Sequence, residues 1–289
     1  MLLGDLLPTN VTMPESARAL DVRGLTADSR AAAPGFLFAA LAGTHTDGAR
    51  FAADAVRRGA IAVLAAPEAS LDVPVPVVRV ADPRRALALA AARLYPRQPE
   101  HLVAVTGTSG KTSVADFTRQ IFAFAGHRAA SIGTLGIVTE AGTDYGTHTT
   151  PDPVSFHAIL DRLAASGITH AAVEASSQGL DQRRVDGLRI QAAAFTNLGR
   201  DHMDYHPTVA DYLAAKLRLF EVVLPAGGTA VIDMDGDRAE TVLAAAEARG
   251  DRVMRVGRAG EEIRIVDIAP RDFRQHLTLQ AFGRHVEVD

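Results

Sequence analysis

The sequence predicts an α/β protein: a small N-terminal α/β domain, residues 1–97, followed by a mainly parallel, doubly wound sheet, residues 98–289. Three observations lead to this fold class. From residue 101 onward, short apolar strands alternate with amphipathic helices, which is typical of parallel sheets. Before that point, the run YPRQP places Pro96 and Pro99 directly after a predicted helix, as expected of a domain boundary. At the C-terminus, HLTLQAF and RHVEVD flank Gly283 like the strands of an antiparallel hairpin.

The elements of the first domain follow from the spacing of its apolar residues. Helical spacing predicts helices over residues 51–59 and 84–95. Between them, the apolar runs IAVLAA (61–66) and VPVVRV (75–80) predict two buried strands.

In the second domain the predicted strands and helices alternate. Pro153 stands near the start of one helix, and Gly126 and Gly167 close two others, which are the positions that favour these residue types. The predicted strands are 101–106, 168–173, 190–195, 229–232 and 252–256, and the predicted helices are 112–125, 152–166, 209–223 and 238–249.

Composition excludes several classes of protein. With 289 residues, 47% of them hydrophobic and 22% charged, the chain is globular rather than disordered. A net charge of −4 gives no general attraction to nucleic acid, so we expect no such partner. The absence of Cys excludes disulfides, thiolate metal sites and a Cys nucleophile. No apolar run approaches the ~20 residues that span a bilayer, and the N-terminus MLLGDLLPTN does not resemble a signal peptide. We therefore expect a cytoplasmic protein.

Lysine is rare in this chain. Of its 30 basic residues, only Lys111 and Lys216 are Lys, and the other 28 are Arg. The two residue types exchange readily on solvated surfaces, but not where chemistry needs a compact or deprotonable amine. Each Lys is therefore a candidate for a role that Arg could not fill.

The segment VAVTGTSGKTS (103–113) follows a predicted strand and opens a predicted helix, as a phosphate-binding loop does. Small residues let backbone N–H groups approach the phosphates, and the helix N-terminus adds a favourable partial charge. In such a loop Lys111 reaches the β- and γ-phosphates and Thr112 binds Mg²⁺. The strict G-x-x-x-x-G-K-[ST] pattern fails because Val105 stands at its first glycine, and Gly107 supplies the early turn instead. The alternative is a glycine-containing turn with a surface Lys.

Unusual polar residues end the next two predicted strands. Glu174 closes ITHAAVE, and the run NLGRDHMDYH, which contains His202, follows QAAAFT. Since ligands of doubly wound sheets bind beyond the carboxyl ends of the strands, Thr112, Glu174 and His202 are expected to converge there. Such a set suits Mg²⁺ beside nucleotide phosphates, although His is not a usual Mg²⁺ ligand. A helix cap or ion pair remains the alternative for Glu174, and an ordinary loop histidine the alternative for His202.

Lys216 lies within VADYLAAKLRLFEVV, on a predicted helix. It stands beside an apolar face formed by Leu213, Leu217 and Phe220, four residues after Tyr212. From spacing alone, a surface lysine with its stem along that face explains the position.

Taken together, TGTSGKTS, EASSQGLDQRR, FTNLGRDHMDYH and YLAAKLRLF resemble, in this order, the ATP-dependent Mur ligases. The resemblance is strongest to the MurE type, the UDP-N-acetylmuramoyl-tripeptide synthetases. The N-terminal TADSRAAAPGFLFAALAGTHTDGARF resembles the uridine-nucleotide domain of that type, and HTTPDP resembles its peptide-binding loop. No single motif is decisive, because GKT occurs in many ATPases and DSR also occurs in the MurF type.

The resemblance implies an amide-forming reaction. ATP phosphorylates the side-chain carboxylate of D-Glu in UDP-N-acetylmuramoyl-L-Ala-D-Glu, and the amine of a diamino acid attacks the acyl phosphate. We expect meso-2,6-diaminopimelate as the diamino acid, with L-lysine as the alternative. The product belongs to peptidoglycan precursor synthesis, and the protein is expected to be a monomer.

The resemblance also implies roles for individual residues around the nucleotide. The phosphate loop binds ATP through Gly107, Thr108, Ser109, Gly110, Lys111, Thr112 and Ser113. Thr112 and Glu174 bind one Mg²⁺, and Glu174 and His202 help to hold a second. The lysine matching Lys216 is carbamylated by CO₂ in this family, giving N6-carboxylysine, whose new carboxylate orients the second Mg²⁺. A permanently protonated guanidinium could not react in this way. Lys111, Glu174, His202 and Lys216 are thus the expected catalytic residues.

Contacts to the UDP-linked substrate carry over in the same way. The residues expected at the uridine diphosphate are Ser29, Arg30, His45 and Thr46. Those expected at the muramoyl-peptide are Thr149, Thr150, Ser176, Gln182 and Arg184, of which Arg184 suits a carboxylate because its fork binds bidentately. The two threonines could equally be ordinary residues leading into a helix.

One part of the family pattern is missing from the sequence. Mur ligases carry a third, C-terminal domain that binds the incoming amino acid, and nothing in this chain resembles it. We therefore expect a truncated chain that is inactive alone. Another Mur-type ligase and folylpolyglutamate synthetase are alternatives within the class. A P-loop kinase or ATPase and a non-catalytic UDP-sugar-binding protein are alternatives outside it.

Overall fold

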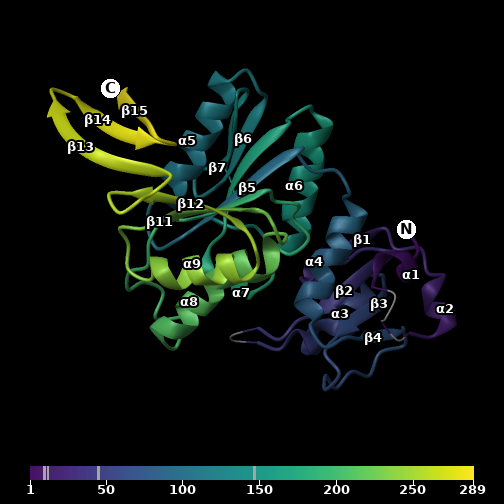
Figure 1. The fold of residues 1–289 in the computed structure, drawn as a ribbon. Helices are drawn as coiled ribbons and strands as arrows, with labels where there is room; N and C mark the ends of the chain where they lie inside the picture. Colours follow the sequence, from purple (N-terminus) through teal and green to yellow (C-terminus); the bar gives the residue numbers. More distant parts are fainter. Residues whose placement is uncertain (9–10, 12, 44–45, 146–147) are drawn as a thin grey trace. The chain divides into compact units, whose positions relative to one another are not determined.

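A computed structural model describes residues 1–8, 11, 13–43, 46–145 and 148–289. These residues form two compact units (Figure 1). The first comprises Met1–Arg97, Asp152–Arg162 and Gln182–Gly187, and the second comprises Gln98–Pro151, Leu163–Asp181 and Leu188–Asp289.

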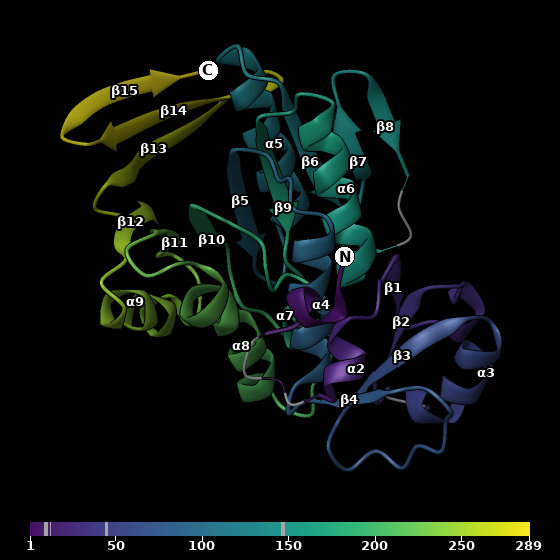
Figure 2. The same cartoon turned by 90° about the vertical axis from the view of Figure 1, so that its right-hand side faces the viewer.

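The first unit is built on a four-stranded parallel sheet in the order β1-β2-β3-β4. Its strands are β1 (Gly24–Thr26), β2 (Phe36–Ala40), β3 (Ala60–Ala65) and β4 (Val77–Arg79). The unit's helices are α1 (Leu3–Leu6), α2 (Glu15–Arg18), α3 (Ala52–Arg57) and α4 (Pro83–Leu94), with short 3₁₀ turns η1 (Ser29–Ala31) and η2 (Gly48–Phe51). Two apolar clusters form its core. One joins β2 and β3 to α1 and α4, and the other joins the same strands to α3 (Figure 2).

The second unit is built on an eleven-stranded sheet in the order β15-β14-β13-β12-β11-β10-β5-β9-β6-β7-β8. Its parallel centre consists of β5 (His101–Thr106), β6 (Ala129–Gly133), β9 (His170–Glu174), β10 (Ala192–Phe195), β11 (Thr229–Asp233) and β12 (Arg252–Gly257). Antiparallel strands extend both ends, namely β7 (Gly136–Thr139) and β8 (Gly142–Asp144) on one side and β14 (Arg274–Ala281) and β15 (Arg284–Val288) on the other. Strand β13 (Ile263–Arg271) links β12 to the terminal hairpin.

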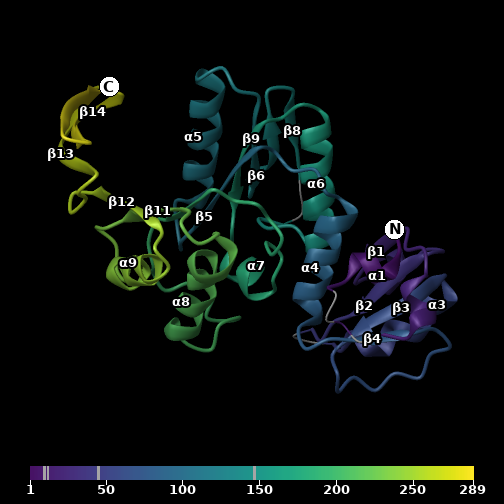
Figure 3. The same cartoon turned by 45° about the vertical axis from the view of Figure 1, so that its right-hand side comes forward.

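The helices of this unit are α5 (Lys111–Phe124), α7 (Ser177–Asp181), α8 (Val209–Arg218) and α9 (Ala239–Ala248). Most of helix α6 (Pro153–Ala165) belongs to the first unit. Helix α5 packs on β5, β6 and β9, whereas α9 packs on β11 and β12 (Figure 3). The chain moves one way along the sheet after β5 and the opposite way after β10 and β11. Right-handed crossovers therefore place α5 on the opposite face from α8 and α9.

The fold class predicted from the sequence is confirmed. The terminal hairpin turns at Phe282 and Gly283 as expected, although β13 extends it to three antiparallel strands. Two predictions differ in detail. The predicted helix over 209–223 ends as an α-helix at Arg218 and continues as a π-helical turn, Leu219–Val223. Strands β1, β2, β6, β7, β8 and β13 were not predicted. All of them except β13 are short, and several lack a run of β-branched residues.

No helix within the described ranges is long and apolar enough to cross a membrane.

Candidate nucleotide and metal site

The phosphate loop lies between β5 and α5, where the sequence predicted it. Two glycines allow its path. Gly107 has φ +149° and a Cβ there would overlap the Thr196 hydroxyl, while Gly110 has φ +83° and directly precedes α5. The loop thus leads directly into the N-terminus of a fourteen-residue helix, whose free N–H groups and dipole favour the binding of an anion.

The segment after β10 holds the loop in place. Thr108 N–H donates to the Asn197 carbonyl at 2.9 Å, and Ser109 N–H donates to the Asn197 side-chain oxygen at 3.0 Å. The Thr196 hydroxyl donates to the Ser109 carbonyl at 2.7 Å. The loop conformation is therefore fixed by protein groups, so that a phosphate would meet a preorganised backbone.

Lys111 folds back onto the loop that precedes it. Its Nζ donates to the carbonyls of Gly107 and Thr108, at 2.9 and 2.8 Å. Burial lowers the pKa of Lys111, an effect that the charges of Glu174 and Asp201 oppose. The ammonium thus lies beside the loop backbone that would surround a bound phosphate. Its partners are backbone carbonyls, which phosphate oxygens could replace as hydrogen-bond acceptors.

Glu174 is the centre of a buried cluster of oxygen atoms at the end of β9. It is 2% exposed, and its Oε2 accepts from the Thr112 hydroxyl at 3.0 Å. Thr134, which follows β6, donates its N–H to Oε1 at 2.8 Å and its hydroxyl to Oε2 at 3.3 Å. Gly133 makes room for the carboxylate, because a Cβ at that position would overlap Oε1. The structure therefore brings Thr112 and Glu174 together, as predicted from adjacent strand ends.

Lys216 is buried, at 1% exposure, which excludes the surface position that spacing alone favoured. Its Nζ donates to the Gly107 carbonyl at 2.7 Å and lies 4.2 Å from the centre of the Tyr212 ring. Lys111 uses the same carbonyl, so both lysines of the chain meet at one oxygen atom. Burial and the neighbouring charge of Lys111 lower the pKa of Lys216 to about 7, against the opposing effect of Asp201. A substantial fraction of this amine is neutral near pH 7.

His202 lies on an exposed loop and is not assembled with the other predicted ligands. Its N–H donates to Asp201 Oδ1 at 2.8 Å, its Nε2 lies 3.7 Å from Asp201 Oδ2, and its ring centre is 6.3 Å from that of Tyr212. Across the described ranges, no group of three or more His, Asp or Glu side chains is arranged to hold a metal ion. Of the four predicted residues, the structure thus joins Thr112 to Glu174 and places Lys216 at the neighbouring phosphate loop, whereas His202 lies apart.

Thr112 and Glu174 together fit one hard cation. The Thr112 hydroxyl and the Glu174 carboxylate are oxygen donors of the kind that Mg²⁺ prefers, and they lie beside the phosphate loop. Within the described residues, the carboxylate accepts its hydrogen bonds from Thr112 and Thr134, which are neutral donors.

The residues expected at the muramoyl-peptide fall into two groups. In the second unit, the Thr149 hydroxyl lies 3.1 Å from that of Thr134, whereas Thr150 is 1% exposed and donates to the Glu174 carbonyl at 2.9 Å. The Thr150 hydroxyl also accepts from Ser176 N–H at 3.0 Å. Thr150 therefore stabilises the start of α7 by its own bonds, while Thr149 stays half-buried beside the cluster.

In the first unit, the Arg184 guanidinium donates to Gln182 Oε1 at 2.7 and 3.2 Å. Ser29 is buried in the turn η1, whereas Arg30 and Thr46 are exposed. His45 lies outside the described residues.

Sequence reasoning missed three residues that shape the site. Thr134 bonds Glu174, the Tyr212 hydroxyl lies 3.1 Å from the Thr108 hydroxyl, and Asn197 fixes the loop. Tyr212 and Asn197 stood within the predicted motifs, but spacing could not show that they reach the loop. Thr134 follows a strand that was itself not predicted, so its only signal was the Gly-Thr pair at 133–134.

Comparison with known proteins agrees with this geometry. The sequence profile of the Mur ligase middle domain matches residues 105–289, and that of the Mur ligase family catalytic domain matches residues 21–95. The chain is 54% identical to the UDP-N-acetylmuramoyl-L-alanyl-D-glutamate–2,6-diaminopimelate ligase of Bradyrhizobium diazoefficiens, covering 100% of the chain and 60% of that protein. It is 52% identical to the protein of the same name from Brucella melitensis, covering 100% of the chain and 59% of that protein.

Among solved structures, a UDP-N-acetylmuramoyl-L-alanyl-D-glutamate–2,6-diaminopimelate ligase superposes with a TM-score of 0.86 at 27% identity. The match covers 100% of this chain and 59% of that structure. The chain thus spans about 60% of the length of the curated relatives it matches. The profile matches, the identities and the phosphate-loop architecture agree, and the chain belongs to the Mur ligase family.

Proposed function

We propose that this chain carries the nucleotide-binding and substrate-binding parts of an ATP-dependent ligase. The reaction joins meso-2,6-diaminopimelate to UDP-N-acetylmuramoyl-L-alanyl-D-glutamate, a step of peptidoglycan precursor synthesis. In this proposal residues 1–97 bind the uridine nucleotide and residues 98–289 bind ATP. The names of relatives at 54% and 52% identity support the substrates. The convergence of Lys111 and Lys216 on the Gly107 carbonyl, beside the Thr112–Glu174 pair, supports the chemistry.

The phosphate loop would act through charge and position. Lys111 would exchange the Gly107 and Thr108 carbonyls for phosphate oxygens of ATP, while the N–H groups at the start of α5 bind the same anion. Thr112 and Glu174 would hold Mg²⁺, which when bound neutralises charge that develops on the phosphates. The γ-phosphoryl group passes to the D-Glu carboxylate, the diaminopimelate amine attacks the acyl carbon, and phosphate leaves as the amide forms.

Lys216 would contribute as N6-carboxylysine. Its neutral amine adds to the carbon of CO₂, forms an N–C bond and loses a proton, which leaves a carbamate in place of an ammonium. Burial of the amine at 1% exposure favours the neutral, reactive form. Carbamylation would replace a positive charge beside the phosphate loop with a negative one. The new carboxylate could bind Mg²⁺, which the free amine cannot do. His202 would complete that site only if its loop moved toward the cluster.

The protein is proposed to act as a monomer in the cytoplasm, where ATP and UDP-linked precursors are made. L-lysine remains the alternative amine. No observation on this chain favours a kinase, although the phosphate loop alone would serve one.

Calorimetry with UDP-N-acetylmuramoyl-L-Ala-D-Glu and with Mg–ATP tests the proposal. The ligase assignment predicts saturable binding of both compounds, whereas a kinase or simple ATPase would bind only ATP. Lys111→Ala is expected to weaken ATP binding by about tenfold or more and to leave the UDP-linked compound unaffected. The exposed substitution Arg57→Ala serves as the control for general loss of one positive charge. Failure of the UDP-linked compound to bind would contradict the proposal.

A further inference from the structure

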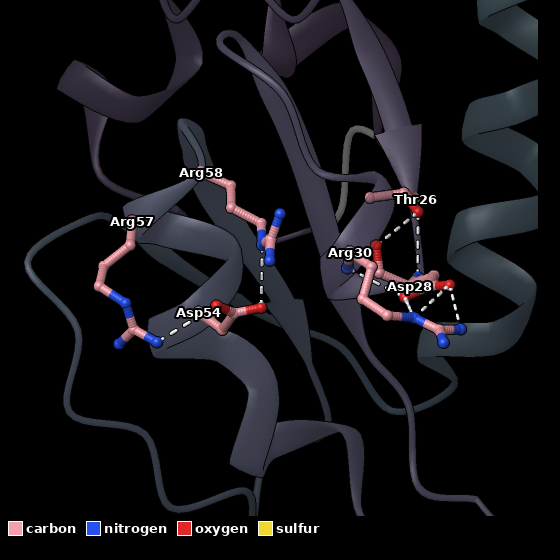
Figure 4. Close-up of polar contacts among 6 residues, drawn as sticks. All are labelled: Thr26, Asp28, Arg30, Asp54, Arg57 and Arg58. Atoms are coloured by element: carbon pink, nitrogen blue, oxygen red, sulfur yellow. Dashed lines mark hydrogen bonds and ion pairs between the residues drawn. The ribbon is translucent and has the colours of Figure 1, made fainter.

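Arg30 was expected to contact the diphosphate of the substrate, but two of its guanidinium nitrogens, Nε and Nη2, bond within its own loop. Its Nε donates to Asp28 Oδ1 and Oδ2 at 2.9 and 3.2 Å, and its Nη2 donates to Oδ2 at 2.7 Å (Figure 4). Its backbone N–H donates to the same Oδ1 at 2.9 Å. One carboxylate therefore receives both the backbone and the guanidinium of the residue two positions later.

Asp28 is held from its other side as well. Thr26, buried at the end of β1, accepts from the Asp28 N–H at 3.0 Å and donates its hydroxyl to the Asp28 carbonyl at 3.1 Å (Figure 4). Asp28 is also the N-cap of the 3₁₀ turn η1, which begins with Ser29. The chain on both sides of Ser29 is thus fixed by hydrogen bonds, while Ser29 itself is buried at 7% exposure.

The pKa values of Asp28 and Arg30 also indicate that these two side chains are paired with each other. Hydrogen bonds from Arg30 lower the pKa of Asp28, and those to Asp28 raise the pKa of Arg30, so both groups are ionised at neutral pH. Because the guanidinium faces a carboxylate across two parallel bonds, the pair presents little net positive charge to an anion. A diphosphate that bound this guanidinium would have to displace Asp28 and would then lie beside its negative charge.

We propose that Asp28 and Arg30 form a brace that positions Ser29 for the uridine nucleotide, and that Arg30 does not itself contact the phosphates. Both are positioning residues, which act through the backbone of η1. This inference rests on the proposed function, since it assumes that the first unit binds a uridine nucleotide. It reverses the role that the sequence resemblance implied for Arg30.

The two possible roles of Arg30 predict opposite changes in UDP affinity for the substitution Asp28→Asn. Asn keeps an oxygen that can cap the Arg30 N–H but cannot form the ion pair. If the pair is a brace, Asp28→Asn weakens UDP binding by about two- to fivefold, the range expected for an exposed pair. If Arg30 binds phosphate directly, the same substitution removes a competing negative charge and strengthens binding.

A double-mutant cycle measured by calorimetry with UDP makes this comparison quantitative. The brace predicts that Arg30→Ala and Asp28→Asn each weaken binding, that the double variant is no weaker than the weaker single variant, and that the salt dependence is unchanged. Arg23→Ala, which removes an exposed charge paired with Asp21, is the matched control and should change the dissociation constant less than twofold. Tighter binding by Asp28→Asn, or a shallower salt dependence for Arg30→Ala, would overturn the brace.

Hydrogen exchange in the unliganded chain separates this inference from the function on which it rests. The brace predicts faster exchange at the backbone amide of residue 30 in both single variants, and no change there in Arg23→Ala. If UDP fails to bind the wild-type chain while this exchange pattern holds, the proposed function is wrong and the brace stands as a property of the loop. If exchange at Arg30 is unchanged in both variants, the brace is wrong whether or not UDP binds.

Discussion

Each edge of the central sheet carries a buried basic side chain, Lys216 at the carboxyl edge and His170 at the amino edge, but the surroundings of the two differ. At the carboxyl edge, Lys111 and Lys216 bond to the Gly107 carbonyl beside the loop after β5. At the amino edge, His101 and His170 begin β5 and β9 as register partners, with ring centres 4.4 Å apart. His127, which follows α5, stacks on His170 at 3.9 Å.

The difference lies in the partners that each edge supplies. At the carboxyl edge, carbonyls, hydroxyls and a carboxylate face the lysines, so a bound anion could exchange places with groups already present. At the amino edge, aromatic rings face one another, and the Phe122 ring lies 4.8 Å from that of His170. Burial lowers the pKa of a base at both edges, but only the carboxyl edge surrounds it with groups that can do chemistry.

The largest expected effect is at Lys216. In the ligase reaction proposed above, Lys216→Arg should lower turnover by about 10²–10³-fold, because a guanidinium cannot form a carbamate. Steady-state ADP release in the presence of both substrates measures this. Lys216→Ala should be equally inactive but partly restored by short-chain carboxylates, which replace the missing carboxylate. Turnover at the wild-type level in the Arg variant would refute the role proposed for the carbamate.

A smaller effect is expected at Thr134. Thr134→Val removes the hydroxyl that donates to Glu174 and leaves the backbone N–H bond, so the carboxylate loses part of its orientation. The affinity for Mg–ATP should fall by about tenfold, as measured by calorimetry. Thr139→Val on β7 is the matched control, since that hydroxyl bonds only to the Gly142 carbonyl. If both variants bind Mg–ATP equally well, Thr134 does not support the cluster.

At the amino edge the expected effect is on stability. Burial, followed by the charges of His127 and His101, lowers the pKa of His170 from its ordinary value of 6.5. The folded state therefore favours neutral His170, so its contribution to stability is present above pH 6.5 and is lost as pH falls through the lowered pKa. His170→Phe should reduce the slope of unfolding free energy against pH by up to about one proton. Denaturant titrations from pH 5 to 8 measure this, with the exposed His285→Phe as control. Identical slopes in all three proteins would disprove the assignment.

The smallest effect is expected on helix α5, which runs between the two edges. Phe124 is 96% exposed, so Phe124→Ser should change the free energy of unfolding by no more than about 0.5 kcal/mol. By contrast, Phe195→Ala removes a ring that is 2% exposed and should cost about 3–5 kcal/mol. A large loss in the Phe124 variant, measured by denaturant unfolding, would show that α5 is covered on that side in solution.

Much of the fold was predictable because local patterns carry it. β5 was predicted over the same residues that form it, since an apolar run, a glycine turn and an amphipathic helix agree there. Strand β6 was not predicted, because Ala129–Gly133 is short and has a single β-branched residue, Ile132. Its position between β7 and β9 comes from pairing with residues distant in sequence.

The site shows the same limit. Glu174 and Thr112 could be placed together because parallel strands end at one edge, which is a rule of topology. The burial of Lys216 could not be predicted, because the buried residues of α8 are Tyr212, Ala215 and Lys216, beside the apolar stripe that spacing suggested. The exposed position of His202, with φ +54°, depends on a loop whose path no periodicity describes.

The π-helical turn that follows Lys216 fixes a rotational register along the helix. In Leu219–Val223 the Leu224 N–H bonds to the Leu219 carbonyl at 2.8 Å, one residue further back than in an α-helix. This turn holds one residue more than an α-helical turn would between Lys216 and Leu224, both of which are buried. Redesign of this helix should therefore keep the number of residues between the two, because deleting one would remove the wide turn together with the bond that closes it.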